Sequence, residues 1–174
     1  MLSDELKESL VEYSSEGTTL NFERLISFLE ESEVSFVKGK FRVPVGGLTT
    51  PEHVYIAIDN LMMMREEMVY FVFLHELCHG LRFIKMGKDY HMDSLSHEEF
   101  GDFADYILYE EILADRYGSL IYKIFNGVSL DKKYTQQLDI QSNAIRYKTV
   151  MGNMYGVVKG DEDNYKELVN TYMY

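Results

Sequence analysis

Residues 72–81 read VFLHELCHGL and contain the pattern His-Glu-x-x-His, which begins at His75 and ends at His79. Apolar residues at helical spacing flank this pattern, and residues four positions apart lie on one face of a helix. Both imidazole rings can therefore bind one Zn²⁺ ion at about 2.0–2.1 Å. Glu76 lies about 100° further around the helix, where it can take a proton from a metal-bound water but cannot easily be a ligand.

The histidines lie on a helix face that is otherwise apolar. Its other members are Met64, Met68, Phe71, Val72 and Met86. Two imidazoles within such a face need a buried polar partner, and a metal ion is one such partner. The alternative is a pair of structural histidines with other hydrogen-bond partners, and metal analysis of the purified protein distinguishes the two.

A third ligand is predicted from a later helix, because a catalytic zinc site uses three protein ligands and keeps one position open. A carboxylate, Glu111, falls on a helix face whose other members are apolar or small: Ile107, Ala114, Gly118, Ile121 and Phe125. A carboxylate there needs a positive partner, which a metal supplies. Asp115, one turn on, can accept the free ring N–H of a ligand histidine. The alternative for both is an ordinary charge pair with Lys or Arg.

The whole chain predicts a single α+β domain over residues 1–174. A small, mostly antiparallel sheet is expected to pack on the helices that carry His75 and Glu111. The expected parts are N-terminal helices (1–32), the small sheet (33–58), metal-site helices (61–126) and C-terminal helices (128–174).

Individual elements follow from caps, alternation and turn residues. Ser3 and Asn21 can cap the two N-terminal helices. Alternation predicts a β-hairpin of residues 34–37 and 40–43, a break at Gly46 and Gly47, and a strand within 53–58. Further helices are expected at 62–86, from a capping box at Ser96 to 125, at 131–151, and from 161 to the end.

Composition excludes several classes of protein. The chain has 174 residues and a net charge of −12, which repels phosphate backbones and disfavours nucleic-acid binding. No apolar run approaches the roughly 20 residues of a membrane span, and the first residues carry neither a basic start nor an apolar core. The lone cysteine, Cys78, excludes an internal disulfide. We therefore expect a soluble protein of the reducing cytoplasm.

The two metal motifs together resemble a known family. HELCH, followed by Glu111, Ala114 and Asp115 in an ExxAD pattern, resembles the gluzincin metallopeptidases, whose third ligand is a Glu in an ExxxD or ExxAD motif. The order of short helices, small sheet, HExxH helix and Glu helix looks most like the compact ImmA/IrrE-type peptidases. The resemblance covers about residues 54–118.

The resemblance implies a zincin-like fold, a Zn²⁺ cofactor held by His75, His79 and Glu111, Glu76 as general base and Asp115 as the partner of a ligand. It also implies that the strand within 53–58 holds an extended substrate by edge pairing. We therefore predict a zinc-dependent metallopeptidase that hydrolyses an intracellular protein or peptide substrate. The alternative is a metal-containing regulatory module that binds a protein partner with little or no turnover.

The group that stabilises the oxyanion is left open by the sequence. Larger gluzincins place a His or Tyr after the Glu helix, but no histidine follows His97 here. The candidates are Tyr147, Tyr155, Arg146, His91 and His97.

Overall fold

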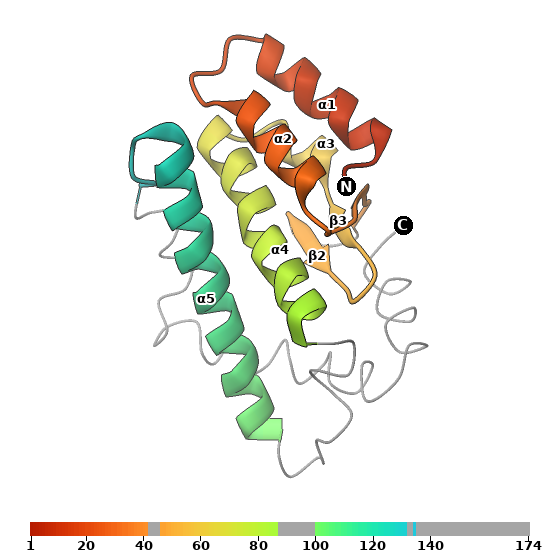
Figure 1. Cartoon of the computed structure of the whole chain (residues 1–174), viewed down its shortest axis with the longest axis vertical. Helices are drawn as coiled ribbons and strands as arrows, with labels where there is room; N and C mark the ends of the chain where they lie inside the picture. Colours follow the sequence, from red (N-terminus) through yellow and green to blue (C-terminus); the bar gives the residue numbers. More distant parts are fainter. Residues whose placement is uncertain (42–45, 87–99, 132–133, 135–174) are drawn as a thin grey trace.

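The computed structural model describes residues 1–41, 46–86, 100–131 and 134. Within these ranges the chain is an α+β protein with five helices and three short strands (Figure 1). The elements are α1 (Asp4–Ser15), α2 (Phe22–Glu31), β1 (Phe36–Lys38), β2 (Gly47–Thr49), β3 (Val54–Ile56), α3 (Ile58–Leu61), α4 (Glu66–Met86) and α5 (Phe100–Asn126).

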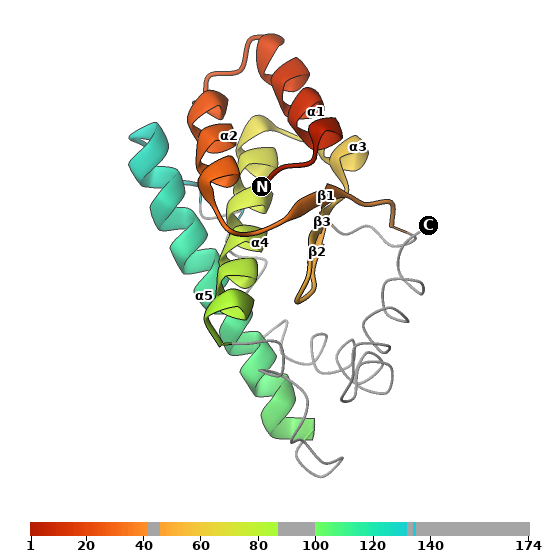
Figure 2. The ribbon, with the colours of Figure 1, turned by 45° about the vertical axis from the view of Figure 1, so that its right-hand side comes forward.

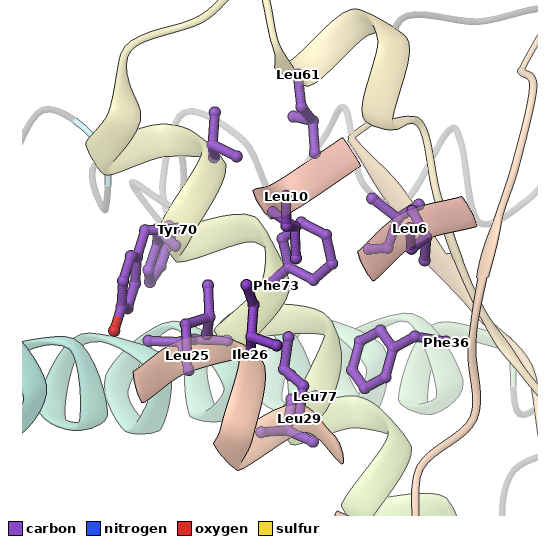
Figure 3. Close-up of a cluster of buried hydrophobic side chains, with 14 of the residues drawn as sticks. Leu6, Leu10, Leu25, Ile26, Leu29, Phe36, Leu61, Tyr70, Phe73 and Leu77 are labelled. Atoms are coloured by element: carbon purple, nitrogen blue, oxygen red, sulfur yellow. The ribbon is translucent and has the colours of Figure 1, made fainter. Parts of the chain in front are cut away.

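Both predicted N-terminal caps are confirmed. The Ser3 side chain accepts a hydrogen bond from the N–H of Leu6, and the Asn21 side chain accepts one from the N–H of Arg24 at 3.0 Å. Each bond satisfies a backbone donor that the first turn of a helix leaves unpaired. The apolar faces of α1 and α2 join the main core, which is shown in Figure 3 with Leu6, Leu10, Leu25, Ile26, Leu29, Phe36, Leu61, Tyr70, Phe73 and Leu77.

The sheet is mixed, with strand order β1-β3-β2. β3 pairs in parallel with β1 and antiparallel with β2, so the prediction of a mostly antiparallel sheet is wrong in part. The predicted hairpin between 34–37 and 40–43 is also wrong, because β1 pairs with β3 on one edge and with the first residues of the chain on the other. Residues 42–45 of this prediction lie outside the described ranges. The strand predicted within 53–58 is confirmed as β3, although Ile58 already begins α3. Gly47 begins β2, where the sequence predicts a break.

The outer edge of β1 is covered by the first residues of the chain. The N–H of Phe36 donates to the carbonyl of Met1 and the N–H of Ser3 donates to the carbonyl of Phe36, both at 2.9 Å. Leu2 and Phe36 form an isolated parallel bridge. The opposite edge of the sheet is β2, whose only strand partner in the described ranges is β3.

The long helix α4 lies between the sheet and α5 (Figure 2). Helices α4 and α5 run in opposite directions along each other (Figure 1). The two helices approach closely at Gly118: a Cβ at this position would lie 3.2 Å from Cε2 of Phe71 and 3.4 Å from the backbone N of His75. On the sheet side, a Cβ at Gly80 would lie 2.6 Å from Cγ1 of Val34.

Other predicted elements fall outside the described ranges. The capping box at Ser96 does so, as do the C-terminal helices beyond Tyr134. Among the helices that the structure describes, none combines the length and apolar character required to cross a lipid bilayer.

Candidate metal centre

Three side chains from α4 and α5 meet at one point between the two helices. Nε2 of His75 lies 3.1 Å from Nε2 of His79. The carboxylate of Glu111 reaches both rings, with Oε2 at 3.2 Å from Nε2 of His75 and Oε1 at 3.1 Å from Nε2 of His79. Each side chain is mostly buried but keeps some solvent contact. The structure therefore brings together the three ligands that the sequence predicts.

The spacing of these donor atoms fits a metal ion. Zinc with ligands at about 2.0–2.1 Å in a tetrahedron holds its donor atoms about 3.3–3.4 Å apart. The two ring nitrogens lie 3.1 Å apart, and each of them lies 3.1–3.2 Å from a different oxygen of Glu111. One donor atom from each of the three side chains lies within 4.8 Å of the other two, so the three side chains converge on a space that one ion could share. Two imidazoles and one carboxylate form a donor set that zinc accepts in catalytic sites.

Asp115 fixes the orientation of the first imidazole. Its Oδ1 lies 2.8 Å from Nδ1 of His75, and only 9 % of the residue is exposed. In the neutral ring, a hydrogen on Nδ1 would donate to this carboxylate and leave the lone pair of Nε2 directed towards Glu111 and His79. Asp115 therefore lies where the sequence predicts the partner of a ligand histidine.

The charges at the site favour a cation. Burial acts to lower the pKa of His75, but hydrogen bonds with Asp115 and Glu111 outweigh it and raise this pKa well above its usual value. Burial acts to raise the pKa of Glu111, but the nearby His79 and hydrogen bonds from both imidazoles outweigh it and hold this pKa well below its usual range. The negative potential that retains a proton here would also attract a divalent ion.

Glu76 lies beside this group, where its carboxylate is turned towards β2. It is 9 % exposed, and the hydroxyl of Thr49 donates a hydrogen bond to its Oε2 at 2.6 Å. Gly47 lies against the same side chain, because a Cβ there would be 2.6 Å from Cγ of Glu76. Sequence reasoning missed both β2 residues. A glycine in a strand often marks a close approach of another group, and Gly47 carries that signal.

One predicted role is wrong. The strand within 53–58 cannot accept a substrate at its edge, because β3 is the central strand and both of its edges are already paired. The predicted oxyanion candidates all lie outside the described ranges: His91, His97, Arg146, Tyr147 and Tyr155.

Cys78 is buried away from solvent, with 7 % of the residue exposed. Burial, with a smaller contribution from the charge of Asp115, raises the pKa of its thiol to about 12. Because the thiolate is the form that binds metal or attacks an electrophile, this cysteine behaves as a small apolar core residue.

Comparison with known proteins found no match to this chain among family models, curated proteins or solved structures.

Proposed function

We propose that this chain is a zinc-dependent metallopeptidase with a zincin-like fold and that it hydrolyses peptide bonds of a protein or peptide substrate. One observation carries the proposal. One donor atom from each of three side chains lies within 4.8 Å of the other two, and the neighbouring buried carboxylate of Glu76 is not part of this donor set. A ligand set alone is compatible with several chemistries, whereas an adjacent carboxylate that can accept a proton favours hydrolysis.

The ion would be held by His75, His79 and Glu111. Zinc bound there supplies a Lewis acid that lowers the pKa of water towards about 7. Glu76 accepts a proton from the attacking water and returns it to the leaving amine nitrogen. Asp115 keeps the ring of His75 in one tautomer and orientation throughout.

We propose that an extended substrate binds along the outer edge of β2 and not along β3. Hydrogen bonds to one neighbour alternate along an antiparallel strand. The carbonyl of Gly46 and the N–H of Thr50 both bond to residues that flank β3. The main-chain groups of Gly47 and Thr49 therefore point away from β3, towards the edge beside Glu76. A peptide in extended form can pair with these groups.

The substitution Glu76→Gln tests the proposal. Glutamine keeps the shape of the side chain and its bond from Thr49 but cannot act as a base at neutral pH. We expect zinc content and thermal stability close to those of the wild type and a loss of about 10²–10⁴-fold in the rate of peptide hydrolysis. Glu23→Gln, on the exposed side of α2, is the matched control and should keep the wild-type rate.

Mass spectrometry of new termini after incubation with peptide libraries measures the reaction. Unchanged hydrolysis in Glu76→Gln would contradict the mechanism. A stable complex with a protein partner, without new termini and insensitive to Glu76→Gln, would support the regulatory alternative in place of the peptidase.

A further inference from the structure

Thr49 contacts the proposed base directly. Its Oγ1 lies 2.6 Å from Oε2 of Glu76 and 3.4 Å from the backbone carbonyl of the same residue. A hydroxyl has one hydrogen to donate, so the shorter contact to the carboxylate takes it. At 2.6 Å, this contact lies at the short end of the range for O–H···O hydrogen bonds.

Gly47 confines the same carboxylate from a second direction. A Cβ at this position would lie 2.6 Å from Cγ, 2.7 Å from Cδ and 2.8 Å from Oε1 of Glu76. The side chain of Glu76 therefore packs directly on the backbone of β2, with one oxygen bonded by Thr49 and the other next to Gly47. The position of this carboxylate depends on the position of β2.

The main chain of Thr49 faces the other way. In an antiparallel pair the side chains point to the two faces of the sheet, while the N–H and C=O groups lie in its plane. Since Gly46 and Thr50 bond towards β3, the N–H and C=O of Thr49 point to the outer edge of β2, where no described residue bonds to them. One residue thus presents its main chain to the substrate edge and its hydroxyl to Glu76.

We propose that Thr49 is a positioning residue that orients Glu76 and transmits the pairing of a peptide with β2 to the placement of this carboxylate. The proposal rests on the proposed peptidase function. β2 is only three residues long and has a single strand partner in the described ranges, so pairing with a peptide strand would restrict its motion. Through the hydrogen bond from Thr49, the position of the Glu76 carboxylate would be restricted as well.

The kinetic test compares Thr49→Val with Thr49→Ser. Valine has nearly the same shape and lacks the hydroxyl, whereas serine keeps the hydroxyl. With the best-cleaved quenched fluorescent peptide from a library, we expect Thr49→Val to lower kcat about 10- to 100-fold with KM changed by less than about threefold, and Thr49→Ser to restore most of the rate. Thr18→Val is the matched control, because the Thr18 hydroxyl bonds to the carbonyl of Ser14 and lies outside the sheet. It should leave kcat close to wild type.

A second readout does not depend on turnover. Urea unfolding of the metal-free protein is measured for Thr49→Val, Glu76→Met and the double variant. We expect the two substitutions to be coupled by about tenfold in the unfolding equilibrium constant, since each removes one partner of the same buried hydrogen bond.

The outcomes separate the two proposals. An inactive wild type overturns the peptidase function, while the unfolding cycle still decides whether Thr49 holds Glu76. An active wild type with an unchanged kcat in Thr49→Val, or with a loss confined to KM, overturns the positioning role. If the effects of Thr49→Val and Glu76→Met on the free energy of unfolding simply add in the double variant, the hydrogen bond between the two residues is overturned.

Discussion

Zinc should raise the thermal stability of this chain, and the gain should depend on the carboxylate of Glu111. The perturbation is Glu111→Gln, which keeps the size of the side chain but removes the charge that lies 3.1–3.2 Å from both imidazoles. The amide is a much poorer zinc ligand than the carboxylate. Loss of an outer partner of a ligand costs about 10- to 100-fold in metal affinity, so loss of a direct ligand should cost at least about 100-fold.

The magnitude follows from linkage. At a free zinc concentration of about 100 times the wild-type Kd, binding stabilises the native state by about 2.7 kcal/mol. For a chain of 174 residues this corresponds to a rise in Tm of about 5–11 °C. A 100-fold weaker site gains about 0.4 kcal/mol at the same concentration, which is a rise of about 1–2 °C. Asp115→Asn, which alters only the partner of His75, should fall between these values.

The assay is thermal unfolding of chelator-treated protein across a zinc titration, with each variant compared with its own metal-free Tm. That comparison removes any effect of the substitution on the fold itself. Glu23→Gln serves as the control and should show the full wild-type rise. A wild type whose Tm does not respond to zinc up to about 1 mM, or a Glu111→Gln variant that shows the full rise, would refute the metal site.

Three further predictions concern the fold around the site. Gly118→Val should lower the free energy of unfolding by about 1–3 kcal/mol and weaken zinc binding, because the added atoms would meet Phe71 and the backbone of α4. Urea titration measures the loss of stability, and an unchanged stability would contradict the close approach of the two helices. Burial raises the pKa of Tyr70 to about 12, above the value of about 10 in an unfolded chain. The stability that its neutral phenol contributes is thus present below about pH 10 and is lost as the pH rises towards 12. The urea midpoint should fall over this range less steeply in Tyr70→Phe than in the wild type, and equal slopes would contradict the burial of the phenol. Cys78 should resist iodoacetamide at pH 8 until the protein unfolds, as followed by mass spectrometry; rapid alkylation of the native protein would show that the thiol is accessible.

Much of the candidate site could be predicted because its residues are related by local geometry. The four-residue spacing of His75 and His79 places both rings on one face of any helix that contains them. The apolar surroundings of Glu111 indicate which face of its helix is buried, and Asp115 follows one turn later on the same helix. Such relations depend on helical periodicity within one segment and need no knowledge of the neighbouring elements.

The sheet could not be predicted in the same way. Any extended segment offers similar N–H and C=O groups to a partner, so the pattern of residues 34–43 is compatible with a hairpin as well as with the parallel pairing that β1 makes with β3. The choice depends on how segments distant in sequence pack on α4. In the structure, the side chains of Val34 and Val54 both pack against α4 at Gly80. This shared packing brings β1 and β3 side by side.

The sequence by itself determined the helix caps at Ser3 and Asn21, the paired imidazoles and the acidic residue expected opposite them, because each of these depends on spacing within a single helix. Only the tertiary structure decided that Glu111 meets both rings, that β2 forms an edge of the sheet and that Thr49 bonds to Glu76. Contacts between separate segments depend on the close packing of helices and strands, and that packing is a property of the whole chain rather than of any local pattern.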